Sequence, residues 1–194
     1  MPNWCANSLK IKPKTKAAKT FMERKLLPEL ERGKDSQIFN LIVPMPQELI
    51  DTVCGSVAED KRDAHKAQME ANVAKFGYPT WYEYAHANWG TKWDACELYY
   101  EADNKGATLW FDTAWAPPMP IYKKLEDMGF EVEATYCEQG MGYAGWYTKG
   151  EDHEHAISFW SGEEEEDDIE DDIEKMMAFF RANGLAHTPA HTGG

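Results

Sequence analysis

NWGTKWDACELYYEADNKGATLWFDTAWAPPMP, residues 88–120, is the stretch that decides the fold, and it holds four of the eight tryptophans. Two runs typical of β-strands, residues 96–100 and 108–116, flank the sequence Asp103-Asn104-Lys105-Gly106. Asp, Asn and Gly favour tight turns because their backbones tolerate left-handed conformations. The pattern therefore predicts a β-hairpin. Alternation in its second strand predicts one face formed by Leu109, Phe111, Thr113 and Trp115.

Upstream of the hairpin, residue spacing predicts a strand, a helix and a second strand. Residues 4–12 place apolar side chains and lysines on alternate sides, as in a strand with one buried face. Residues 16–32 have apolar residues at helical spacing after Thr15, a favourable N-cap, and Pro28 predicts a kink or restart within this helix. Residues 37–43 (QIFNLIV) are almost wholly apolar, which predicts a central strand covered on both faces.

The remaining elements complete an α+β pattern. Residues 46–88 predict a helical insertion between strands, with Thr80 as the N-cap of its last helix. After the hairpin come a short helix that ends near Gly129, a strand over residues 130–138, and two edge strands over residues 145–148 and 155–160. This order predicts a ferredoxin-like split βαβ sandwich over residues 1–160, an antiparallel sheet with helices on one face.

The C-terminal sequence differs from the rest in charge. The chain has a formal net charge of −14, and ten of the twelve residues 163–174 are acidic. Apolar residues recur at helical spacing through this run, which predicts an acidic amphipathic helix within residues 161–184, followed by a flexible tail over residues 185–194. The apolar positions are Ile169, Ile173, Met176, Met177 and Phe180.

The amino-acid composition favours a packed domain without disulfides or membrane helices. Apolar residues make up 43% of the chain, so a packed domain is expected. The four cysteines are widely spaced without a CxxC motif, which is typical of a reduced cytosolic protein. No apolar run is long enough for a membrane helix, and no secretory signal is recognised. We expect no metal or cofactor and no catalytic residue, and we assign His153-Glu154-His155 to an exposed loop.

Four motifs together resemble the YubB-like family, which is carried by phages and plasmids. They are MPNWCANSL from residue 1, FNLIVPMPQEL from residue 39, NWGTKWDA from residue 88 and FDTAWAPP from residue 111. The resemblance extends from residue 1 to about residue 146. It implies a ferredoxin-like domain of unknown function in a mobile-element accessory protein of a bacterial cytoplasm. The family brings no established catalytic residues, and the acidic helix lies outside the resemblance.

The leading functional hypothesis is a non-enzymatic binding module, although the sequence alone does not decide whether the protein has a catalytic activity. A row of carboxylates attracts basic surfaces, so we expect the partner to be a host protein with a basic surface, in a defence or nucleic-acid-processing system. Direct nucleic-acid binding is disfavoured by the net charge, and the oligomeric state is left open. The partner-binding residues predicted here are Glu163, Glu164, Glu165, Glu166, Asp167, Asp168, Glu170, Asp171 and Asp172.

Two alternatives stay open. The first is a small-ligand or enzyme pocket in which indoles stack a planar ligand and two carboxylates accept hydrogen bonds. Its predicted residues are Trp89, Lys92, Trp93, Asp94, Asp112 and Trp115. The second is single-stranded nucleic-acid binding on the sheet, with Tyr99 and Trp110 stacking bases and a phosphate track of lysines. These lysines are Lys10, Lys12, Lys14, Lys16 and Lys19.

Overall fold

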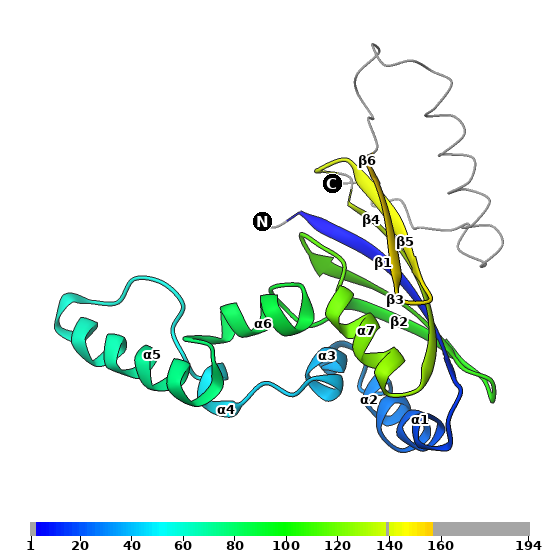
Figure 1. Ribbon diagram of the computed structural model, residues 1–194, viewed down its shortest axis with the longest axis horizontal. Coiled ribbons are helices and arrows are strands. Elements are labelled where there is room, and N and C mark those ends of the chain that lie inside the picture. The colour runs from blue at the N-terminus through cyan, green and yellow to red at the C-terminus, as the bar shows by residue number, and fades with distance from the viewer. Residues whose placement is uncertain (1–2, 139, 157–194) are drawn as a thin grey trace, which may run out of the picture.

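The computed structural model describes residues 3–138 and 140–156, and they form a sheet with helices packed on one face (Figure 1). The sheet is antiparallel, with the strand order β2-β3-β1-β4-β5-β6. Its strands are β1 (Trp4–Pro13), β2 (Cys96–Ala102), β3 (Ala107–Ala114), β4 (Phe130–Glu138), β5 (Tyr143–Thr148) and β6 (Glu151–Ala156). The order of the first four is that of a split βαβ unit, which confirms the predicted ferredoxin-like fold. Strands β5 and β6 widen the sheet beyond β4.

Strand register decides which side chains form the core. Leu9 lies between Leu109 and Ala134, and all three point towards the helices. Four helices cover this face: α1 (Lys16–Phe21), α2 (Leu27–Leu30), α3 (Ile38–Ile42) and α7 (Met119–Asp127). The side chains of Met22, Phe39 and Ile121 are fully or almost fully buried against it. The opposite face, which we call the open face, carries the alternate residues of each strand.

The first helical segment confirms both predictions made for it. Thr15 Oγ1 accepts a hydrogen bond from Ala18 N at 3.1 Å and so caps α1. A π-helical turn, η1 (Met22–Leu26), follows, in which Leu27 N donates to Met22 O. Helix α2 then restarts with Pro28 in its first turn, where a missing backbone N–H is tolerated.

The strand predicted over residues 37–43 is wrong, because this segment forms helix α3. Its N-terminal amides are held by a remote side chain: Asp94 accepts hydrogen bonds from Phe39 N and Asn40 N, both at 2.9 Å. At the other end, Asn40 Oδ1 accepts from Met45 N at 2.8 Å. A short run that is almost wholly apolar shows no clear amphipathic period, so its sequence does not distinguish a strand from a helix.

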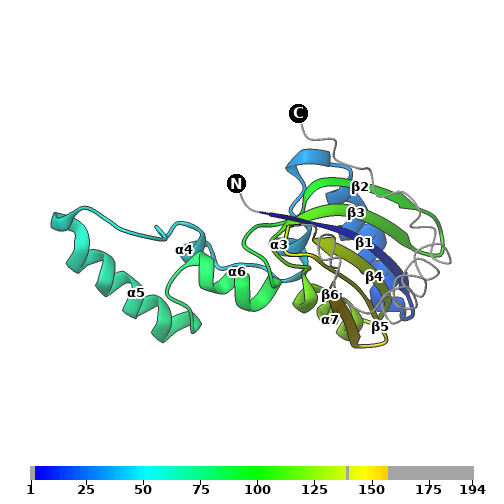
Figure 2. The same cartoon turned by 90° about the horizontal axis from the view of Figure 1, so that it is seen from above.

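A helical arm projects away from the sheet (Figures 1 and 2). It consists of α4 (Gln47–Ile50), α5 (Arg62–Phe76) and α6 (Trp81–Trp89), with short 3₁₀ turns η2 (Gly33–Asp35) and η3 (Glu59–Lys61) before and within it. Thr80 Oγ1 accepts from Tyr82 N at 3.2 Å, so the predicted N-cap of α6 is confirmed. Helix α6 joins the arm to the core through buried Tyr84 and Trp89.

The predicted hairpin is confirmed as β2 and β3. Asp103 N donates to Gly106 O at 2.9 Å, and Asp103 Oδ1 accepts from Lys105 N and Gly106 N. However, β3 ends at Ala114 and Trp115 is exposed, so the prediction that Trp115 shares a face with Leu109 and Phe111 is wrong.

The C-terminal strand begins earlier than predicted. Strand β6 includes both His153 and His155, so the predicted exposed loop is wrong. Residues 157–160, the acidic helix predicted within 161–184 and the tail of 185–194 lie outside the described residues. Among the helices that the structure describes, none is long and apolar enough to span a membrane.

Candidate functional site

The six residues of the predicted pocket do not form one group. Trp89 is buried in the core, where its Nε1 donates to Val43 O at 2.9 Å and its ring lies 6.3 Å from that of Phe39. Asp94 lies beside it, under the N-terminus of α3. These two residues anchor the helix layer against the hairpin.

The carboxylate of Asp94 is engaged by backbone donors. Besides Phe39 N and Asn40 N, Ala95 N donates to it at 2.8 Å. Burial raises the pKa of Asp94 to about 6, although these hydrogen bonds oppose the shift. Asp112 lies on the open face instead, across from Ala6 and Cys96 in the neighbouring strands. The two carboxylates of the predicted pocket therefore point to opposite sides of the sheet.

The other three predicted residues lie around the start of β1 and form a surface with Trp4. We call Trp4, Lys92, Trp93 and Trp115 the tryptophan patch. Its three indole side chains are exposed by 39%, 37% and 46%, in the order Trp4, Trp93 and Trp115. The rings of Trp4 and Trp93 are 6.1 Å apart, and Lys92 Nζ lies 4.6 Å from the Trp93 ring centroid. Large exposed aromatic surfaces of this kind are typical of interaction sites.

Trp115 has an unusual backbone conformation, with a φ of 72°. A bulky residue in the left-handed region is a rare and strained arrangement, with a cost of about 1–3 kcal/mol. Two contacts hold it there: Trp115 N donates to Asn3 O at 3.0 Å, and Tyr143 Oη donates to Trp115 O at 2.5 Å. These two contacts hold the backbone conformation in which the indole lies at the surface.

A buried hydrogen-bond network lies beneath the patch and accounts for several motif residues. Asn7 Nδ2 donates to Cys5 O at 2.7 Å and to Thr113 Oγ1 at 2.9 Å, while Asn7 Oδ1 accepts from Tyr122 Oη at 3.1 Å. Thr113 Oγ1 in turn donates to Ala116 O at 2.8 Å. Burial raises the pKa of Cys5 to about 12, so this thiol stays protonated and unreactive at neutral pH. The network links β1, β3 and α7, so we assign it a role in stabilising the fold.

The open face carries the aromatic residues that the nucleic-acid alternative requires. Tyr99 lies directly across from Trp110. Three of the five lysines of the predicted phosphate track lie beside carboxylates of β4. Lys12 and Lys14 pair with Glu131 at 3.1 Å and 2.5 Å, and Lys10 Nζ lies 4.0 Å from Glu133. This pairing reduces the positive charge available to phosphates.

The histidines that the sequence placed in a loop instead lie on β6 and stack on an indole. The ring centroids of His153 and His155 are 5.0 Å and 5.2 Å from that of Trp146, and both pairs are nearly parallel. Their i, i+2 spacing on a strand places both rings on one face, the alternative to the loop that this spacing also allows in the sequence. Within residues 3–138 and 140–156, no three His, Cys, Asp or Glu side chains converge as a metal site would need.

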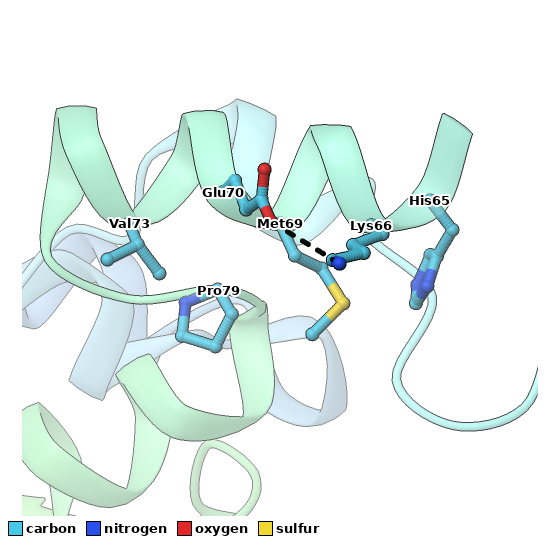
Figure 3. Close-up of a pocket in the computed structure, with 6 residues that line it drawn as sticks. All are labelled: His65, Lys66, Met69, Glu70, Val73 and Pro79. Carbon is cyan, nitrogen blue, oxygen red and sulfur yellow. Dashed lines mark ion pairs between the residues drawn. The ribbon is translucent and has the colours of Figure 1, made fainter. Parts of the chain in front are cut away.

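An open depression lies on the arm, away from the tryptophan patch (Figure 3). Met69, Val73 and Pro79 form its apolar lining, and Lys66 pairs with Glu70 at 4.0 Å along its rim. His65, its sixth lining residue, bonds to Val53 O at 3.0 Å. This depression brings together no acid–base pair suited to catalysis.

Comparison with known proteins supports the fold and leaves the activity open. Residues 88–180 match the model of a family described as the ferredoxin-like domain in Api92-like protein. No curated protein matches the chain. The crystal structure of a protein Api92 from Yersinia pseudotuberculosis is similar at a TM-score of 0.40 and 12% identity, over 83% of this chain and 100% of that one. The YubB-like membership and the mobile-element origin stay predictions.

Proposed function

We propose, from the premise that residues 88–180 resemble the ferredoxin-like domain of Api92-like proteins, that this protein is a non-enzymatic binding module for a protein partner. The observation that supports the proposal is the conformation of Trp115, whose indole is exposed while its backbone is held in the left-handed region. Strain of this kind is concentrated at functional sites. Tryptophan is also among the residues that contribute most to protein interfaces.

The acidic residues 163–172 supply the charge in this proposal. They would attract a partner with a basic surface and make association fast and sensitive to salt. Proteins that process nucleic acids have such surfaces because they bind phosphates. We therefore propose that the partner is a host defence or nucleic-acid-processing protein in a bacterial cytoplasm, and that the chain serves a phage or plasmid as its inhibitor.

The test compares the capture of basic host proteins by three forms of the full chain. Trp115→Gly removes the indole from the patch, and Tyr99→Ala removes an exposed aromatic from the open face as a matched control. The proposal expects a basic protein that is retained at low salt by the wild type and by Tyr99→Ala, and lost with Trp115→Gly. Equal retention by all three forms would refute the role of the tryptophan patch.

Neutralising the acidic run tests the electrostatic part separately. Replacing Asp167, Asp168, Asp171 and Asp172 with Asn is expected to weaken retention at low salt and to flatten its salt dependence. If retention has the same salt dependence in this variant, the acidic residues do not contact the partner.

A further inference from the structure

On the open face, two tryptophans flank a strip of smaller residues, and we call this strip the valley. Trp110 on β3 and Trp146 on β5 lie in one row across the sheet, with Ser8 and Thr135 between them. Neighbouring strands are about 4.8 Å apart, so three strand spacings place these walls roughly 14 Å from each other. The floor consists of small residues on β1 and β4, namely Ala6, Ser8, Thr135 and Cys137. An α-helix with its side chains is about 10–12 Å wide, a width of the same order as this backbone separation.

The floor is well suited to contact with another element. Ser8 and Thr135 are only 8% and 4% exposed, although the helices of the described chain cover the other face. Ser8 Oγ is buried and has no hydrogen-bond partner among the described residues. Small residues on a sheet allow a helix to approach closely, and such close approach is needed because dispersion attraction acts only over short distances.

The chain itself contains a segment with the matching properties. The predicted acidic helix has an apolar stripe, formed by Ile169, Ile173, Met176, Met177 and Phe180, which must be buried against some surface. Residues 163–181 would form a helix about 28 Å long, and the ten residues of β1 span roughly 33 Å. The family match extends to residue 180, so it covers this stripe together with strands β2 to β6.

The connection is long enough. Strand β6 ends at Ala156, at one edge of the sheet, and the centre of the valley lies two to three strands away, or roughly 12 Å. The six residues 157–162 can span up to about 20 Å. The carboxylates of Glu131 and Glu133, which engage Lys10, Lys12 and Lys14, make the face less suited to a nucleic-acid strand.

We propose that the apolar stripe of residues 169–180 docks in the valley between Trp110 and Trp146, with its carboxylates directed outward. The sheet then has helices on both faces, and the acidic residues lie on a rigid support. This inference goes beyond the proposed function and does not rest on it, because it concerns contacts within the chain.

The first test measures how fast a maleimide labels Cys137, on the valley floor, in the full-length protein. The double variant Ile173→Asp/Met177→Asp places charges in the stripe, and Asp171→Asn/Glu174→Gln changes the outward side as a matched control. We expect labelling of Cys137 to become at least ten times faster in the stripe variant and to stay unchanged in the control. Buried Cys5, read by mass spectrometry of the same samples, reports that the sheet is intact. An unchanged Cys137 rate in the stripe variant overturns the proposal.

The second test identifies the occupant by cross-linking. In a Cys54→Ser background, which removes the exposed thiol, Met177→Cys is treated with a short bifunctional thiol reagent, and Glu174→Cys serves as the outward control. A link between Met177→Cys and Cys137 within one chain supports the proposal. A link between two chains, no link, or protection of Cys137 by added single-stranded DNA overturns it in favour of a second copy, a free segment or a nucleic-acid site.

Discussion

Asp94 caps the N-terminus of a helix that precedes it by 55 residues, with Oδ1 2.9 Å from Phe39 N and Oδ2 2.9 Å from Asn40 N. The contact joins the helix layer to the segment that leads into β2. It also explains why an acidic residue is buried within the NWGTKWDA motif: both carboxylate oxygens satisfy amides that helix α3 leaves without an internal partner.

Replacing Asp94 with Ala is expected to destabilise the fold. The change leaves the amides of Phe39, Asn40 and Ala95 without their acceptor in a part-buried position. We expect the free energy of unfolding to fall by about 2–3 kcal/mol, as measured by urea denaturation. Asp103→Ala, which removes an exposed turn acceptor, should have a smaller effect. Equal effects would contradict the capping role.

The pKa of Asp94 predicts a pH dependence of stability. Burial raises this pKa to about 6 in the folded state, above its ordinary value of 3.8, so the folded protein binds the proton more tightly than the unfolded chain does. The resulting stabilisation is fully present below pH 3.8 and is lost as the pH rises through about 6. Relative to Asp94→Asn, the wild type should lose on the order of 2–3 kcal/mol between pH 4 and 7. If the unfolding free energies of the wild type and Asp94→Asn change in parallel with pH, the raised pKa of Asp94 is ruled out.

Trp115→Gly should separate binding from stability. Glycine adopts a φ of 72° without steric cost, so the melting temperature should stay the same or rise, with a gain of up to about 1 kcal/mol. Loss of an interface tryptophan should weaken partner binding by about 2 kcal/mol, or roughly 30-fold. Trp115→Ala is the companion variant, because it removes the indole and keeps the backbone strain. A large loss of stability in the glycine variant would show that the indole serves packing instead.

The network around Asn7 should behave as a unit. Asn7→Ala removes the donor to Thr113 Oγ1 and leaves Tyr122 Oη without its buried acceptor, so we expect a loss of about 2–4 kcal/mol in unfolding free energy. Tyr122→Phe alone should cost about 1 kcal/mol. The double variant should be less destabilised than the sum of both, because the two changes share one hydrogen bond. Additive losses in the double-mutant cycle would contradict the coupling.

Gly90 should not tolerate a side chain. It ends α6 with a φ of 79°, and a Cβ there would lie 2.7 Å from Pro120 Cδ. We expect Gly90→Ala to cost about 2 kcal/mol or more, since it combines a left-handed alanine with a steric clash. Gly77→Ala is the matched control, because its φ is 81° and its added Cβ would meet open space. Similar losses in both variants would show that backbone conformation alone sets the cost.

Local signals in the sequence were sufficient for most of the fold. Alternation gave β1 and β4, the Asp103–Gly106 turn located the hairpin, and Thr15 and Thr80 marked helix starts. Residues 37–43 were assigned wrongly because the cap that makes them helical comes from a residue far along the chain. The candidate site was harder, since tryptophans in the core and on the surface have the same spacing pattern. The structure distinguishes them by exposure, and the left-handed backbone of Trp115 is encoded by no residue type.

The central position of β1 in the sheet has a consequence for folding during synthesis on the ribosome. The neighbours of β1 are β3 and β4, which are both synthesised much later. The partner of Asn7 on β3 is Phe111, 104 residues further along the chain, so Asn7 cannot form a sheet contact before that residue is made. During synthesis the apolar side of β1 emerges early and without a partner, which exposes the nascent chain to aggregation. Lys10 and Lys12 lie on the other side of this strand. Their charge reduces aggregation of the unpaired strand until β2 and β3 have been synthesised.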